Sequence, residues 1–156
     1  MMVGTDLGIM PTMTLYQVLL IAHVLGVVMW LGSSLTMFLL WRRAVRSGDD
    51  EALKTQSEIS LWIERRLAIP AAIVVLLAGG WLMTEGNWGM DQGWLHIGMG
   101  AVFGAAGILL LWTGRFQRRL VLENGAALIS RITVGMLASM GMVLVAFWAM
   151  IAKPWS

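Results

Sequence analysis

Four long apolar runs, separated by charged stretches, dominate this chain of 156 residues. The runs cover approximately residues 14–41, 67–84, 94–112 and 132–152. Each is long enough to cross the hydrocarbon core of a bilayer as a helix, which takes about 20 residues. Because lipid offers no hydrogen bonds to the backbone, spanning segments of this kind are helices. The pattern therefore predicts an all-α integral membrane four-helix bundle, with residues 1–156 forming a single transmembrane domain.

The segment between the first two runs has an amphipathic pattern. Acidic residues at 49–51 are typical of a helix N-terminus, where they favour the helix dipole. Apolar residues then recur between Leu53 and Ile63, and Pro70 stands near the start of the second run. We expect a cytoplasmic amphipathic helix that leads into span two, bends at Pro70 and keeps its charges on a solvated face near the lipid headgroups.

The distribution of basic residues predicts the direction of the spans. Of the 11 Lys and Arg residues, six lie within 42–66, four within 115–131, and only Lys153 lies on the other side. Because cytoplasmic loops carry the excess of Lys and Arg, both termini and the 85–93 loop should face outward. We expect a bacterial inner-membrane protein with periplasmic termini. The tryptophans fit this direction, because they gather at both membrane–water interfaces. Those at the inner interface are Trp41, Trp62 and Trp112, and those at the outer interface are Trp88, Trp94 and Trp155.

Composition narrows the function. The chain is 58% hydrophobic and 13% charged, whereas a soluble domain is about 45–50% apolar and about 25% charged. This balance excludes an ordinary soluble enzyme and a nucleic-acid binder. With no cysteine in the sequence, disulfides, cysteine-ligated metals and thiol catalysis are excluded too. The partners that remain are the lipid bilayer, further copies of the chain or a larger membrane complex, and no nucleic acid is expected.

His23 is the sharpest chemical feature of the sequence. It lies about 12 Å below the outer end of the first span at the helical rise of 1.5 Å per residue. An ionisable residue at such a depth normally faces the bundle interior, and imidazole is a common axial ligand of heme iron. Gly26 and Trp30 follow on nearly the same helix face, where Gly26 leaves room for a flat macrocycle and the indole walls it. The alternative is a structural histidine that bonds to a carbonyl or hydroxyl of a neighbouring helix.

His96 is the second candidate metal ligand. It heads a stripe of glycines on one face of the third span, in which Gly100 and Gly104 form a GxxxG pattern. Such a pattern permits close contact between helices, with His96 then lying at the wet interface. Alternatively, His96 is the second axial ligand or a propionate partner of a heme, and Gly100 makes room for the porphyrin.

Methionines near the outer surface offer a copper site as an alternative. The outer edge holds Met10 and Met13, and the second outer turn holds Met83 and Met90 near His96. Thioethers are soft ligands that suit Cu(I). Methionine is also a common apolar filler of cores, so the copper interpretation competes with simple packing.

Three segments resemble the HemJ-type protoporphyrinogen oxidases and the related CopD-like membrane proteins. His23, followed by Trp30 and then by small residues, is similar to the first helix of that group. The Gly-Trp-Leu-His sequence at 93–96 is similar to the start of its third helix, and Lys-Pro-Trp at 153–155 to its end. The resemblance implies a four-helix bundle that binds a b-type heme with His23 as ligand.

Two departures from the family pattern affect the expected chemistry. The family's lysine after Trp-Leu-His-Ala falls at Gly98, and the Asn-Glu-x-Pro run at the start of the last helix is absent at Arg131 and beyond. We therefore expect a CopD/HemJ-like relative that binds heme b and takes part in electron transfer or heme-related redox chemistry. Whether it is an enzyme stays open, as do a cofactor-free accessory subunit and a CopD-type copper uptake or resistance protein.

Overall fold

A computed structural model describes residues 13–122 and 126–153 of the chain. These residues form helices joined by short turns. In chain order the elements are α1 (Leu15–Ser47), α2 (Asp50–Ile63), the π-helical η1 (Glu64–Ala68), α3 (Ile69–Glu85), α4 (Gly93–Gly107), the π-helical η2 (Ile108–Thr113), α5 (Gly114–Leu122) and α6 (Ala126–Ala152). Among them are four helices long and apolar enough to cross a membrane. The all-α membrane bundle is therefore confirmed.

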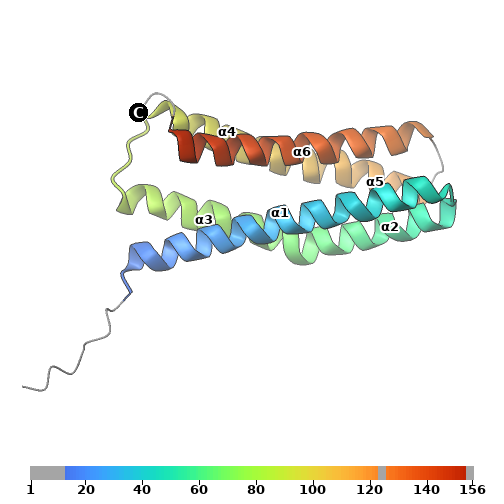
Figure 1. Ribbon diagram of the computed structural model, residues 1–156, viewed down its shortest axis with the longest axis horizontal. Helices are drawn as coiled ribbons and strands as arrows, with labels where there is room; N and C mark the ends of the chain where they lie inside the picture. Colours follow the sequence, from blue (N-terminus) through green and yellow to red (C-terminus); the bar gives the residue numbers. More distant parts are fainter. Residues whose placement is uncertain (1–12, 123–125, 154–156) are drawn as a thin grey trace, which may run out of the picture.

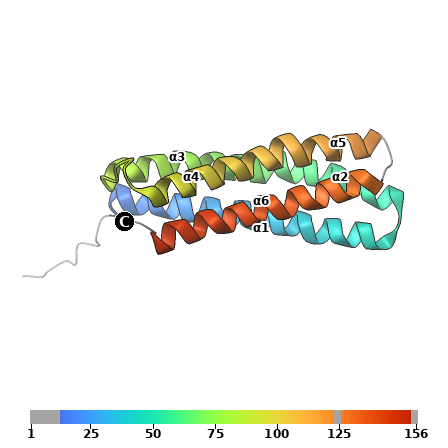
Figure 2. The same cartoon turned by 90° about the horizontal axis from the view of Figure 1, so that it is seen from above.

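The bundle consists of two helical hairpins that lie side by side (Figures 1 and 2). In the first, α1 packs chiefly against α3, and in the second, α4 packs chiefly against α6. The hairpins meet where α1 contacts α6 along the bundle and where α2 contacts α5 at one end. We call that end the arginine-rich end, because the arginines of 42–66 and 115–131 lie there. The opposite end, with the 86–92 turn and the C-terminal end of α6, is called the Lys153 end below.

Local signals explain where α1 begins and ends. Thr14 and Gln17 form a capping box, in which each side chain bonds to the other's backbone N–H. Gly48 ends the helix in the left-handed conformation with φ of 67°, which costs glycine little. The helix has 33 residues, so it is about 50 Å long and exceeds a hydrocarbon core of about 30 Å. Its last turns therefore extend beyond the membrane at the arginine-rich end.

The stretches expected as connections are mostly helix. The amphipathic helix predicted after the first span is present as α2, with Asp49 accepting a bond from the Glu51 N–H at 2.9 Å. It continues through η1 into α3, so no loop precedes the second span. The wider turn of η1 ends next to Pro70, which lacks an N–H and clashes with the usual carbonyl partner of a regular helix. A second wide turn, η2, joins α4 to α5 in the same way.

Apolar side chains cover the outside of the bundle, as expected for a lipid-facing surface. Leu77 is 70% exposed, Leu111 76% and Ile151 67%. A soluble monomer rarely exposes large continuous apolar patches of this kind. Small residues fill much of the interior, where Ala105 and Ala149 are fully buried, and the large Trp30 and Trp41 are buried as well. The chain thus places its apolar groups toward the membrane and its small ones between helices.

A buried polar layer lies at the arginine-rich end, where α2 and η1 face α5. Its members are Gln56, Ser57, Ser60, Glu64, Thr113 and Gln117. The Glu64 carboxylate lies against Gly114, since a Cβ at that glycine would be 3.4 Å from one carboxylate oxygen. The expectation that the charges of this segment form a solvated face is therefore wrong for Glu64. Its side chain is only 5% exposed because α5 covers it.

Candidate functional site

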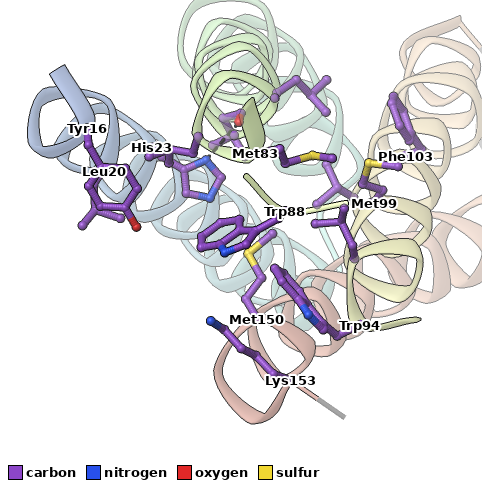
Figure 3. Close-up of a pocket in the computed structure, with 17 residues that line it drawn as sticks. Tyr16, Leu20, His23, Met83, Trp88, Trp94, Met99, Phe103, Met150 and Lys153 are labelled. Carbon is purple, nitrogen blue, oxygen red and sulfur yellow. Dashed lines mark hydrogen bonds between the residues drawn. The ribbon is translucent and has the colours of Figure 1, made fainter. Parts of the chain in front are cut away.

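A cavity of about 540 Å³ opens between the two hairpins at the Lys153 end. Its walls come from α1, α3, α4 and α6, together with Trp88 from the turn between α3 and α4 (Figure 3). Its volume lies within the range of about 300–1,000 Å³ that is typical of pockets for small molecules and cofactors. The lining is mainly apolar, and its polar side chains are Tyr16, His23, Lys153 and the indoles of Trp88 and Trp94.

His23 lies on the α1 wall of this cavity, and its ring is held by α3. Its Nδ1 is 3.0 Å from the carbonyl oxygen of Val75. Because a carbonyl only accepts hydrogen bonds, Nδ1 carries the proton and donates it, which leaves the lone pair on Nε2. Gly79 packs against the same ring, since a Cβ there would lie 3.0 Å from Cε1 of His23. The backbone of α3 therefore fixes both the orientation and the tautomer of the imidazole.

This bond fits both interpretations of His23 from the sequence. A structural histidine bonded to a neighbouring carbonyl would look the same at Nδ1. A metal-ligating histidine also donates its other N–H to a carbonyl or carboxylate, which orients the ring. The difference lies in what adjoins the remaining ring atoms. In this protein they adjoin a cavity large enough for a cofactor.

Two tryptophans and a lysine form the mouth of the cavity. Trp88 and Trp94 meet edge to face with ring centroids 5.5 Å apart. The Nζ atom of Lys153 lies 5.1 Å from the centre of the Trp88 ring and 5.4 Å from that of Trp94, within the range of cation–π contact. Asn87, with φ of 50°, lies in the turn just before Trp88, whose indole lines the cavity (Figure 3). The mouth thus combines flat apolar surface with one positive charge.

Three methionines from three helices also line the cavity. They are Met83 of α3, Met99 of α4 and Met150 of α6 (Figure 3). Met150 packs along α4, since a Cβ at Gly98 would lie 3.6 Å from its Cε. Flexible thioethers adapt to irregular ligands and are also weak metal ligands. The cavity therefore brings one imidazole and three sulfur atoms into the same space.

Gly26 and Trp30 share the His23 face of α1 but do not line the cavity. A Cβ at Gly26 would lie 2.9 Å from Cγ2 of Val75 and 3.2 Å from the carbonyl oxygen of Ala71. Gly26 therefore allows the close approach of α1 and α3. Trp30 is buried in the core at 2% exposure, and its Nε1 has no hydrogen-bond partner among the residues that the structure describes.

His96 and Gly100 lie on the exposed surface of α4, apart from the residues that line the cavity. Nδ1 of His96 is 3.3 Å from the Gln92 carbonyl oxygen of the preceding turn. No described atom of another element lies within 4 Å of the Cβ position at Gly100, whereas Gly104 packs against Met142 of α6. The structure thus brings His23 to the cavity and does not bring His96 to it.

The methionines proposed for copper are spread apart. Met10 lies outside the described residues, as does Trp155, while Met13 and Met90 are more than half exposed. Among the described members of that group, only Met83 lines the cavity. Within residues 13–122 and 126–153, no group of three or more His, Asp and Glu side chains is placed to hold a metal ion.

Sequence reasoning missed Tyr16, Met99, Met150 and Gly79 as site residues. Signals for the two methionines were weak, because methionine is a frequent core residue. The glycine pair at 79–80 inside the second span was the clearest signal of a site residue. Glycine inside a helix often indicates that another group packs closely against the backbone. Two segments of the family resemblance do converge here, because Trp94 and Lys153 both line the cavity that holds His23.

Comparison with known proteins adds a family to this geometry. No curated protein and no solved structure matches the chain. Residues 17–154 match the family described as "Predicted integral membrane protein (DUF2269)", a range that covers nearly all of the four spans and every cavity-lining residue except Tyr16. The chain therefore belongs to this family of integral membrane proteins.

Proposed function

We propose that this protein binds heme b in the cavity at the Lys153 end, with His23 as an axial ligand, and takes part in electron transfer. The observation that carries the proposal is the hydrogen bond between Nδ1 of His23 and the Val75 carbonyl. It keeps the lone pair on Nε2 and orients the ring, which is the usual outer-shell arrangement of a metal-ligating histidine. When bound, heme supplies a one-electron couple at its iron.

The remaining walls of the cavity suit the other parts of a porphyrin. The macrocycle is flat and apolar, and Leu76, Leu95 and Val102 offer apolar surface. The propionates are anionic, and the ammonium group of Lys153 lies at the mouth between two indoles. We propose Lys153, rather than His96, as the propionate partner, because Lys153 lines the cavity.

We place the protein in a bacterial inner membrane with both termini and the cavity mouth on the periplasmic side. The support is the excess of Lys and Arg at the opposite end of the bundle. The CopD/HemJ resemblance supports heme, but the position of the family's lysine is Gly98, which is buried against Met150. Electron transfer therefore fits these residues better than protoporphyrinogen oxidation.

The test is the visible spectrum of the detergent-purified protein, oxidised and dithionite-reduced. We expect a Soret peak with sharp α and β bands after reduction, in wild type and in His96→Ala. His23→Ala should lose the Soret absorbance, because Nε2 of His23 is the anchor of the iron. His96→Ala is the matched control, since it removes an imidazole outside the cavity.

Other outcomes identify other functions. A colourless protein that holds copper, lost on His23→Ala, would favour a copper site formed by His23 and the cavity thioethers. A colourless, metal-free protein that co-purifies with other membrane subunits would favour an accessory subunit. A Soret band that survives His23→Ala would contradict the assignment of the ligand.

A further inference from the structure

We propose that the second axial ligand of the iron is a methionine thioether from the α4–α6 hairpin, Met99 or Met150. This inference rests on the proposed function, and it replaces His96 as the second ligand. It starts from the donor atoms around the cavity. Besides His23, these belong to Tyr16, Lys153, Met83, Met99 and Met150.

The two walls of the cavity restrict which donors can pair with His23. A flat macrocycle between the hairpins takes its axial ligands from opposite faces. His23 lies on α1 and is fixed by α3, so its own wall is the α1–α3 hairpin. Tyr16 and Met83 belong to that same hairpin. The opposite ligand must come from the wall formed by α4 and α6.

Three donor side chains of the cavity belong to that opposite wall. Lys153 lies at the mouth, with its Nζ over the rings of Trp88 and Trp94. Its charge there suits the propionates, and an ammonium group has no lone pair to give a metal. Met99 and Met150 remain, and both are partly buried in the cavity wall.

The depths of these thioethers match that of His23. Met99 lies six residues into α4, about 9 Å from its start at 1.5 Å per residue. Met150 lies at the same level, because its Cε packs against Gly98, the neighbour of Met99. His23 lies eight residues into α1, about 12 Å from its start. Because α1 and α4 begin at the same end of the bundle (Figures 1 and 2), the two walls place imidazole and thioether at similar depths.

The ligand pair has a consequence for the redox role. Iron with histidine and methionine ligands has a higher reduction potential than the same iron with two imidazoles. Burial in an apolar cavity also disfavours the charged ferric form relative to the ferrous form. The inferred site would therefore act as an electron acceptor from low-potential donors rather than as a strong reductant.

The experiment compares Met99→Leu, Met150→Leu and Met83→Leu in the full-length, heme-loaded protein. Leucine keeps the apolar volume and removes the sulfur. The readouts are the near-infrared charge-transfer band of methionine-ligated ferric heme, magnetic circular dichroism, and the reduction potential. We expect the thioether band in wild type and in Met83→Leu, and its loss in one of the other two variants while the Soret band stays. That variant should also have a lower potential.

A gain-of-ligand variant makes the test independent of loss. Met99→His and Met150→His each place an imidazole on the wall opposite His23, and at the true ligand position the spectrum should become that of bis-histidine heme. A wild-type spectrum without the thioether band, or loss of the band in Met83→Leu, would overturn the methionine assignment and leave the heme proposal standing. Absence of any Soret band would overturn both.

Discussion

At the scale of single residues, the His23 ring depends on the glycine beside it. Gly79 leaves space for the imidazole, whereas Gly107 of α4 does not line the cavity and no described atom of another element lies within 4 Å of its Cβ position. We expect Gly79→Ala to push the ring away from the Val75 carbonyl and to lower heme affinity about tenfold or more, as for other outer-shell changes. Gly107→Ala should bind as wild type. Heme titration followed at the Soret band measures both, and equal affinities would contradict a positioning role for Gly79.

The sequence was enough to single out His23 as a candidate site residue, but not the residues that line the cavity with it. A lone imidazole in an apolar run costs free energy unless it has a partner, so its presence there indicates a functional or bonded residue. Met99, Met150 and Lys153 carry no such mark, because methionine is common in cores and a lysine at a helix end is common at interfaces. Only the packing of the two hairpins places them around His23. His96 shows why such a mark is ambiguous, since a histidine at a helix surface has the same sequence signal as one that faces a cavity.

At the scale of elements, the contact between α1 and α3 depends on Gly26. A Cβ there would lie 3.2 Å from a backbone oxygen of α3, which cannot rotate away as a side chain can. We expect Gly26→Ala to separate the helices and to destabilise the bundle by about 1–3 kcal/mol, the usual cost of overpacking. Gly32→Ala, on the same helix with no described neighbour within 4 Å, should be neutral or slightly stabilising. Thermal unfolding in detergent compares them, and equal midpoints would contradict the close-approach role.

The lengths of the elements were only partly predictable. An apolar run reports the part of a helix that lies in lipid, so the four spans were located correctly. It does not report where the helix ends, because Arg, Lys and Glu continue a helix well in water. For this reason α1 extends to Ser47 and α2 joins α3 without a loop. The burial of Glu64 could not be predicted from the local sequence, because the helix that covers it, α5, is far away in sequence.

At the scale of the whole molecule, the two ends of the bundle are built differently. At the arginine-rich end, α2 packs against α5 around the polar layer, and the hairpins are held together. At the Lys153 end, the corresponding space between α3 and α4 holds the cavity. A bundle closed at one end and hollow at the other would suit the proposed heme site near one membrane surface. If the proposed electron transfer takes place, the direction of the bundle decides which compartment supplies the redox partner.

That direction gives a prediction which the chain is well suited to test, because it contains no cysteine. Met90 is exposed in the 86–92 turn, and Glu58 is exposed on α2 at the opposite end. If the basic end is cytoplasmic, Met90→Cys should react almost completely with a membrane-impermeant maleimide added to intact bacterial cells. Glu58→Cys should stay at background until the membrane is permeabilised, which controls for its reactivity. The opposite pattern would place the cavity mouth on the cytoplasmic side and would require a cytoplasmic redox partner.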